Sequence, residues 1–275
     1  MNFVEKILNT QNEEEIENLV KQEIDKYNKD QKDECNLGFV FANKLEKPYN
    51  GFIGKNCRIK FSNLSMITYG IKDDSYLYEF VKLFKKNNIK NKTQLVIFLE
   101  AYLNYYFGKL VHGDVRDNFF YEKLEITTTD DEYFDMIESF DLTDLKKLGI
   151  AMCTERGAMA QNIMTLFGFD SYYCMGYLSH NGNTDAHCYN VVRIKGGYRL
   201  LDYSVPVLQY TKNSERYVPF MVDLTNEEFE KFMTEDFTKI VDDYELEIVD
   251  GETIRRPLQN RIYTNGKEPE VMKTL

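Results

Sequence analysis

The sequence predicts an α+β fold, and three observations carry that prediction. Apolar residues recur at helical spacing at 12–29 and again at 74–84. A helical pattern that begins at Cys153 gives way to consecutive β-prone segments that run to Pro206. Short turn signals rather than long helices separate those segments, so an antiparallel sheet is expected beside the helices.

The N-terminal quarter is expected to contain one helix and a small β-containing region. Residues 12–29 form an amphipathic pattern with a charged outer face. The β-prone runs at 38–42, 58–62 and 66–71 follow, broken by turn chemistry at Pro48, Asn50-Gly51 and Gly54. We therefore assign residues 1–72 to an N-terminal helix with a small β-containing extension.

The next segment, residues 73–210, is expected to be the core. Asp74 and Ser75 can cap a helix through residue 84, and residues 93–106 are apolar nearly all round, which is typical of a buried helix. Residues 127–136 are acidic and predict a surface loop or a short helix start.

Residues 211–275 are expected to extend the core with a helix and strands. A helix is predicted at 226–240, where Thr225 and Glu228 have capping-box spacing. Residues 244–263 predict one or two closing strands.

Charge and composition exclude several classes of partner. The 275-residue chain has a formal net charge of −11 and no Lys/Arg stripe, which argues against nucleic acid as the main partner. The N-terminus lacks a basic start followed by an apolar run, and no stretch approaches the ~20 apolar residues that span a bilayer. We expect a cytoplasmic protein without a membrane partner. The sequence does not indicate an oligomeric state.

The five cysteines indicate free thiols rather than a disulfide framework or a metal site. Their number is odd, their spacings are wide and no CxxC pair occurs. No metal and no organic cofactor is expected. Cys174 and Cys188 lie in the middle of predicted strands and are interpreted as packing residues. Because side chains alternate along a strand, Cys188 is expected to point away from the face of its neighbour His187.

Cys153 differs from the other thiols because it opens a helix. Met159, Ile163, Leu166 and Phe167 predict a buried stripe, Gly168 is a C-terminal stop, and small residues at Gly157 and Ala160 let another element approach closely. Unpaired N–H groups and the positive end of the dipole lower a thiol pKa at this position. The same N–H groups can stabilise an oxyanion on a carbonyl that the sulfur attacks.

Two strands can supply a base and its orienting acid. Strands are expected at 172–178, 186–194 and 198–203, with a polar loop at 179–185. A two-residue turn at Lys195-Gly196 places Asp202 opposite Tyr189, diagonal to His187 at roughly 7–8 Å, which side chains can close to a hydrogen bond. A turn at Gly196-Gly197 would instead place Asp202 opposite Val191, which is too distant without a bulge.

The segment from 148 to 206 resembles the transglutaminase-like fold, a rearranged relative of papain-type enzymes. The family's helix opens on the cysteine, here Cys153, and ends in an entry to a strand, here 168–170. The strand with a glycine corresponds to 175–177, the histidine motif to 187–192, and the aspartate motif to 198–202. The match covers about 60 residues. Tyrosine stands where the family often has tryptophan, so the second oxyanion donor is not identified.

The resemblance implies a papain-like core in which the Cys153 helix packs on an antiparallel sheet carrying His187 and Asp202. It implies a triad of nucleophile, base and orienter that attacks an amide carbonyl of a protein or peptide and forms a thioester. Hydrolysis by water is favoured over transfer to an amine.

Four further residues near this triad are candidates for substrate contact: Glu155, Arg156, Tyr189 and Asn190. Two other functions stay open. The Cys153-Thr154-Glu155 run also fits the C-x-E of arylamine N-acetyltransferases, although the arginine-glycine pair usual before that cysteine is absent. The third possibility is a non-catalytic protein-binding module on the same fold, against which the presence of all three triad residues argues.

Overall fold

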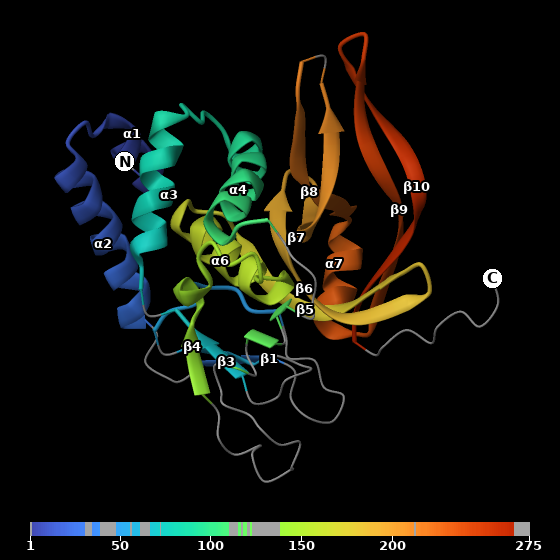
Figure 1. Ribbon diagram of the computed structural model, residues 1–275, viewed down its shortest axis with the longest axis horizontal. Helices are drawn as coiled ribbons and strands as arrows, with labels where there is room; N and C mark the ends of the chain where they lie inside the picture. The colour runs from blue at the N-terminus through green and yellow to red at the C-terminus, as the bar shows by residue number, and fades with distance from the viewer. Residues whose placement is uncertain are drawn as a thin grey trace.

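The computed structural model describes residues 2–30, 35–38, 48–55, 57–60, 67–71, 73–109, 115–116, 118–119, 122, 138–211 and 213–266. Residues 127–136, for which a loop or helix start is expected, lie outside these ranges. The fold is α+β, as the sequence predicts, with helices on one side and a β-barrel on the other (Figure 1).

Four helices form the side of the molecule that contains the N-terminus (Figure 1). Each has an apolar face because apolar residues recur every three or four positions, and Phe80 contacts rings on α4 and at the end of α6. These helices share one cluster of buried side chains with α6, which we call the helical core. They are α1 (Phe3–Asn9), α2 (Glu13–Asp30), α3 (Ser75–Lys86) and α4 (Lys92–Phe107).

Helix α6 (Cys153–Leu166) lies between the other helices and the barrel, and its burial exceeds the single stripe that the sequence predicts. Nearly all of its side chains are buried, polar ones included. The polar ones are satisfied by backbone groups: Asn162 bonds both the N–H and the carbonyl of Ile53, and Gln161 donates to the carbonyls of Gly51 and Ser171. A helix enclosed on all sides holds its N-terminus in a fixed place.

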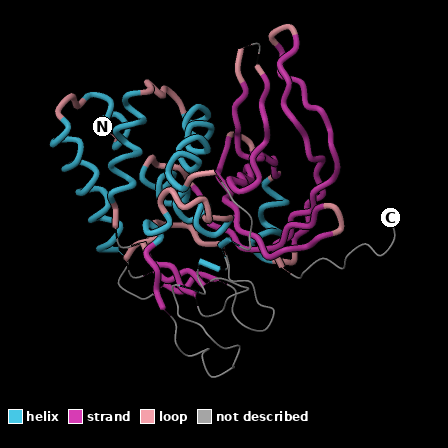
Figure 2. Tube along the Cα trace, viewed as in Figure 1, coloured by secondary structure: helices cyan, strands magenta, loops and turns pink. Residues whose placement is uncertain are grey.

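A small four-stranded sheet lies beneath the helices (Figure 2). Its strand order is β1-β2-β3-β4, and it draws its last strand from the sequence just before α6. A short 3₁₀ helix follows that strand and leads toward the loop before Cys153. The elements are β1 (Cys35–Gly38), β2 (Cys57–Lys60), β3 (Ile67–Gly70), β4 (Glu138–Asp141) and η2 (Leu142–Leu145).

The second sheet closes into a five-stranded barrel in the order β6-β5-β10-β9-β7, with β7 returning to β6. Strand β8 pairs with β7 outside this ring, and α7 (Asn226–Thr234) packs against β7, β8 and β9 (Figures 1 and 2). The strands are β5 (Ser171–His180), β6 (Asn183–Ile194), β7 (Gly197–Tyr210), β8 (Glu215–Leu224), β9 (Phe237–Val249) and β10 (Glu252–Asn265).

Closure of the barrel depends on β9 and β10, so these C-terminal strands contribute to the body that carries the histidine and aspartate strands. Strand β10 pairs antiparallel with β5 and β9, while β9 meets β7 in parallel at Gln209 and Leu246. The antiparallel sheet expected from the sequence is therefore a closed, mixed barrel. The barrel closes because strands far apart in the sequence pair with one another, and no local sequence pattern predicts that pairing.

The register of β6 and β7 follows the first of the two turns considered. Lys195 and Gly196 form the turn, with Gly196 at φ +93°, and the paired residues run from Ile194–Gly197 to Asn190–Leu201. Continuing that register sets Asp202 opposite Tyr189, as the sequence predicts. The backbone pairing stops at Asn190 and Leu201, which lie beside the site.

Three expectations for local structure are wrong. The N-terminal quarter, for which one helix is expected, contains both α1 and α2. The polar loop at 179–185 is a tight two-residue turn, because Asn181 and Gly182 both adopt positive φ (+53° and +76°), the geometry of a type I′ hairpin. The helix expected at 226–240 ends at Thr234, and residues from Phe237 onward enter β9. Barrel closure overrides the helical pattern there.

Side chains from the barrel strands divide between two clusters. Cys188 and Tyr203 belong to the helical core beneath α6. Their neighbours in the chain, such as Tyr189, belong to a second cluster between the barrel strands and α7, which we call the barrel core; it also contains Tyr263 of β10. This alternation of side chains along the barrel strands determines which residues can contact the N-terminal end of α6.

Candidate active site

Cys153 is the first residue of α6, and its backbone setting is that of a helix N-terminus. Met152 before it is extended (φ −109°, ψ −153°), and the first intrahelical hydrogen bond runs from the Arg156 N–H to the Met152 carbonyl. The amides of Cys153, Thr154 and Glu155 therefore precede the first helical hydrogen bond and lie at the positive end of the dipole. The Cys153 side chain is 9% exposed.

His187 of β6 and Asp202 of β7 are hydrogen-bonded, as the register predicts. The distance from His187 Nε2 to Asp202 Oδ2 is 2.7 Å, and both side chains are buried. Since Asp202 occupies Nε2, Nδ1 is the ring nitrogen left for a second partner. The Cys153 thiol lies close to the same imidazole, since each group shifts the pKa of the other.

Asp202 is held by more groups than the sequence indicates. Its Oδ2 also accepts from the Tyr263 hydroxyl at 2.8 Å, and its Oδ1 accepts from the N–H and hydroxyl of Ser204 at 3.0 and 2.7 Å. The Ser204 hydroxyl lies 3.3 Å from His187 Nε2 as well. The Asp-x-Ser spacing is a local side-chain-to-backbone motif that could have revealed Ser204. Tyr263 comes from β10, and no local signal points to it.

The charges of the three groups reinforce one another. Burial opposes ionisation of Asp202, but the His187 charge and the hydrogen bonds it accepts lower the Asp202 pKa to about 2. Burial likewise opposes protonation of His187, yet Asp202 and Cys153 raise the His187 pKa from 6.5 to about 10. Hydrogen bonding from Cys188 and the charge of His187 hold the Cys153 pKa well below its usual value of 9.0. The favoured state at neutral pH is a thiolate beside an imidazolium.

Cys188 corrects one sequence-based expectation. Its side chain leaves β6 on the face opposite His187, as alternation requires, but it does not point away from the site. Helix α6 covers that face, so the Cys188 thiol contacts Cys153 and lies 3.5 Å from Thr154 Oγ1. Alternation gives the face of Cys188 correctly but does not say which face α6 covers.

Glu155 and Arg156, candidates for substrate contact, are buried and bonded to the protein instead. Glu155 accepts the Met152 N–H at 2.8 Å and pairs with Arg116 at 2.6 Å, while Arg116 also donates to the Ile150 carbonyl. The two charges fix the loop that precedes the nucleophile.

The Arg156 guanidinium donates to the carbonyls of Ala151, Gly108 and Tyr203 and to the side chain of Asn104. It thereby joins the nucleophile loop to α4 and to the strand of Asp202. Arg156 and Glu155, both candidates for substrate contact, are thus bonded to backbone and side-chain groups around Cys153.

Tyr189 and Asn190 are also buried rather than presented to a substrate. The Tyr189 hydroxyl donates to the Thr264 carbonyl at 3.2 Å, inside the barrel core. The Asn190 amide donates to the Gly157 carbonyl at 3.1 Å and thus joins β6 to α6. A Cβ at Gly157 would lie 3.0 Å from the Tyr173 ring, which explains the small residue that the sequence shows there. Both side chains therefore join elements of the fold: Tyr189 joins β6 to β10, and Asn190 joins β6 to α6.

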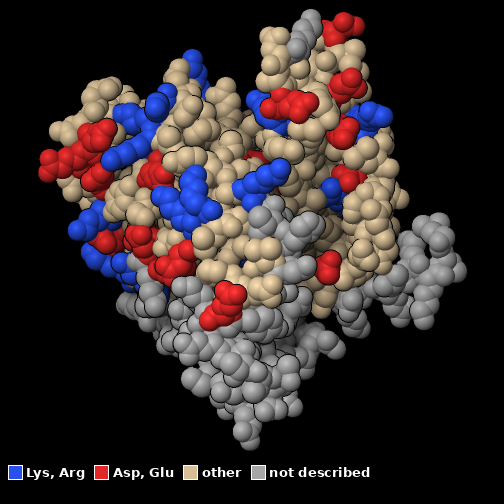
Figure 3. Space-filling model, in the orientation of Figure 1, with Lys and Arg blue, Asp and Glu red and all other residues tan. Residues whose placement is uncertain are grey.

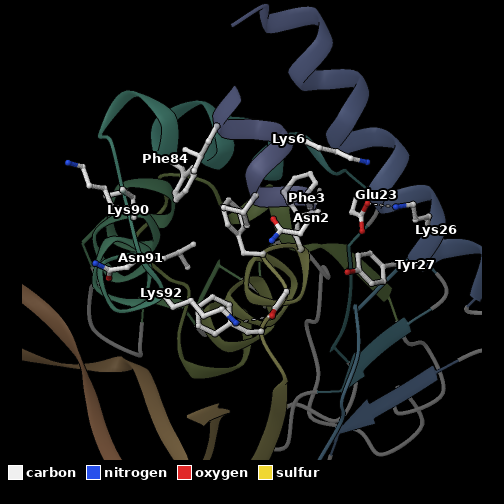
Figure 4. A pocket seen from close by; sticks show the side chains of 18 residues that line it. Asn2, Phe3, Lys6, Glu23, Lys26, Tyr27, Phe84, Lys90, Asn91 and Lys92 are labelled. Carbon is white, nitrogen blue, oxygen red and sulfur yellow. Dashed lines mark hydrogen bonds and ion pairs between the residues drawn. The ribbon is translucent and has the colours of Figure 1, made fainter. Parts of the chain in front are cut away.

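A cavity of about 570 Å³ lies elsewhere, between α1, α2, the start of α4 and the end of α6 (Figure 4). It is lined by Phe3, Tyr27 and Phe84, among others. Since α6 has 14 residues and a helix rises 1.5 Å per residue, this cavity is separated from Cys153 by about 20 Å of helix. It is not part of the cysteine site.

Among the described residues, neither a cluster of metal ligands nor a membrane-spanning helix is found. Among those residues, no group of three or more His, Cys, Asp or Glu side chains is placed to hold a metal ion. None of their helices combines the length and the apolar character that crossing a membrane requires. On the face drawn in Figure 3, the coloured Lys/Arg and Asp/Glu side chains intermix rather than form a stripe of one sign.

Comparison with known proteins yields no relative. No family model matches the chain, and neither a curated protein nor a solved structure matches it significantly.

Proposed function

We propose that the chain is a cysteine-dependent acyl-transfer enzyme that attacks an amide carbonyl, with a core of the transglutaminase-like class. The supporting observation is the arrangement of three side chains: a thiol at a helix N-terminus, an imidazole close enough to lower the pKa of that thiol, and a buried carboxylate 2.7 Å from Nε2 of the imidazole. This is the nucleophile, base and orienter geometry of acyl transfer. The order of helix, histidine strand and aspartate strand supports the family assignment.

The first half-reaction forms a thioester. The Cys153 thiolate attacks the carbonyl carbon, and the carbonyl electron pair moves to oxygen. The first-turn amides of α6 can donate to that oxyanion. His187 then gives its Nδ1 proton to the departing nitrogen, which leaves as ammonia or an amine, while Asp202 keeps the ring oriented.

The second half-reaction regenerates the thiolate. Neutral His187 takes a proton from water or from an incoming amine, which attacks the thioester carbonyl. Collapse of the tetrahedral intermediate expels the Cys153 thiolate and leaves His187 protonated. Water gives hydrolysis and an amine gives transfer. We favour hydrolysis of a protein or peptide amide, since water needs no dedicated acceptor site.

Acylation by p-nitrophenyl acetate tests this proposal without a known substrate. The reduced protein is mixed with the ester and digested with trypsin, and the acetyl group is located by mass spectrometry. We expect it on the 148–156 peptide, which contains Cys153. His187→Ala should slow both acylation and its loss. A chase in water or in a primary amine then separates hydrolysis from transfer. Acylation no faster than in His187→Ala would reject the proposal.

A further inference from the structure

A second thiol lies directly against the candidate nucleophile. Cys188 reaches the N-terminal end of α6 from β6: its sulfur lies 3.5 Å from Oγ1 of Thr154, the residue after Cys153, and it is close enough to Cys153 to lower the pKa of that thiol. The two side chains belong to the same helical core, with exposed fractions of 9% for Cys153 and 3% for Cys188. Both cysteines are free thiols.

We propose that Cys153 and Cys188 form a reversible disulfide that blocks the nucleophile when the protein meets a peroxide. The inference rests on the proposed function in one respect only: the site it switches off is the acyl-transfer site. It makes Cys188 a resolving thiol, a role that no feature of the sequence assigns to it.

The fold holds these two sulfurs together and keeps a third one apart. Cys153 is fixed by the enclosed helix α6, and Cys188 is fixed by β6, whose next residue but one, Asn190, is bonded to α6 through Gly157. Thr154 adds a contact of 3.5 Å to the Cys188 sulfur. Cys174, by contrast, points into the barrel core, on the other side of the strands.

The two thiols also differ in pKa, in the direction that disulfide formation requires. Hydrogen bonds from Cys188 and the charge of His187 lower the pKa of Cys153, so its sulfur is the thiolate that reacts with peroxide. Burial and the neighbouring Cys153 sulfur raise the pKa of Cys188, which therefore stays a thiol and is protected from direct oxidation. A reactive thiolate beside a protonated partner is the arrangement of a redox-sensing pair.

The chemistry takes two steps and balances with one hydrogen peroxide. The Cys153 sulfur attacks one peroxide oxygen, the O–O bond breaks, and hydroxide leaves to give a sulfenic acid and, with a proton, water. The Cys188 sulfur then attacks the Cys153 sulfur, the S–O bond breaks, and the Cys188 proton leaves with that oxygen as a second water. Two thiols are oxidised to one disulfide, and an external dithiol reverses the change.

Peptide mapping after peroxide treatment tests the pairing. The reduced full chain is treated with hydrogen peroxide, remaining thiols are alkylated, and non-reduced digests are analysed by mass spectrometry. Trypsin places Cys153 in 148–156 but both other candidates in 157–193; cleavage after Tyr177 or Leu178 by chymotrypsin separates Cys174 from Cys188. We expect a 153–188 linked pair that dithiothreitol removes. A treated protein without this pair, or with Cys174 in its place, would overturn the inference.

Two serine variants separate the role of Cys188 from that of Cys174. Cys174→Ser is the matched control and should form the 153–188 pair as the wild type does. In Cys188→Ser the sulfenic acid has no resolving partner, so Cys153 should pass to sulfinic acid, which dithiothreitol does not reverse. If Cys188→Ser does not fold, the mapping of the wild type and of Cys174→Ser still decides the question.

Acylation by p-nitrophenyl acetate separates this inference from the proposed function. Peroxide should lower the acylation of wild-type Cys153 by about tenfold or more, and dithiothreitol should restore it. A disulfide in a protein whose reduced form is never acylated would remove the proposed function and leave the redox pair. Acylation that peroxide abolishes without a 153–188 link would do the opposite.

Discussion

Replacing Asp202 by asparagine removes one charge from the buried centre of the site while keeping its shape. The carboxylate accepts four hydrogen bonds, from His187, Tyr263 and the N–H and hydroxyl of Ser204. Asparagine can still accept both bonds from Ser204, but its NH₂ group faces His187 Nε2. The imidazole must then carry its proton on Nδ1, toward the thiol, and it can no longer take a proton from Cys153.

The free energy involved follows from the Asp202 pKa. Burial opposes its ionisation, but His187, Ser204 and Tyr263 lower the pKa from 3.8 to about 2. Each pKa unit is worth about 1.4 kcal/mol, so the folded state gains about 2 kcal/mol from the ionised carboxylate. Because the folded pKa is lowered, this stabilisation is present above pH 3.8 and is lost as the pH falls through about 2.

The variant is therefore expected to be less stable than the wild type by about 2 kcal/mol at pH 7, with about half of that difference left at pH 3. Urea unfolding followed by circular dichroism measures both values, since the chain has no tryptophan. Alkylation of Cys153 by iodoacetamide at pH 6 should slow by about tenfold or more.

A matched control is Asp223→Asn on the neighbouring strand, whose carboxylate is 63% exposed and pairs with Arg199. It should change stability by no more than about 1 kcal/mol. If Asp202→Asn kept both the stability and the Cys153 reactivity of the wild type, the ion pair derived for this site would be refuted.

Three further substitutions test the surroundings of the site. Gly176→Ala should lower the free energy of unfolding by about 3 kcal/mol or more in urea, because its Cβ would overlap the Thr264 carbonyl and push β5 away from β10. Glu100→Gln should be more stable than the wild type by about 3 kcal/mol at pH 8 and equal to it at pH 4, since burial raises the Glu100 pKa from 4.5 to about 7 and ionisation through that window costs stability. Glu155→Gln should lose about 3–5 kcal/mol and slow Cys153 alkylation, because it removes a buried carboxylate that pairs with the buried Arg116.

Each of these has a control and an outcome that contradicts it. The atoms nearest to a Cβ at Gly51 belong to the Tyr49 side chain, at 3.1 Å or more, so a loss in Gly51→Ala equal to that of Gly176→Ala would argue against the strand-separation mechanism. Glu227→Gln removes a carboxylate that is 78% exposed and should leave stability unchanged at both pH values. A Glu100→Gln variant with no pH-dependent gain would show that Glu100 is not strained by burial, and a stable, fully reactive Glu155→Gln would show that the loop before Cys153 needs no anchor.

The sequence predicts those features of the fold and of the site that short-range sequence signals determine. The helix that opens at Cys153 and stops before Gly168, and the pairing of β6 with β7, follow from capping, periodicity and one glycine turn. Those three signals are enough to bring His187 to hydrogen-bonding distance of Asp202. The α+β class follows from the same patterns.

What the sequence misses depends on residues far apart in the chain. Tyr263 reaches Asp202 only because β10 closes the barrel, and Arg116 reaches Glu155 across 39 positions. The face on which α6 packs is likewise set by tertiary contacts, and that choice moves Cys188 from an expected packing role to a contact with the nucleophile. Alternation along a strand gives two faces but does not say which one the helix covers.

The most direct test of a thiolate–imidazolium nucleophile is the pH dependence of Cys153 alkylation in the reduced protein. Iodoacetamide is applied from pH 4 to about pH 9, the modified cysteine is located by mass spectrometry, and His187→Ala is measured beside the wild type. We predict that Cys153 reacts fast below neutral pH, ahead of Cys174 and Cys188, whose pKa values burial raises, and that His187→Ala loses this advantage. A Cys153 that reacts only as an ordinary thiol near pH 8.5, with the same profile in His187→Ala, would contradict the account.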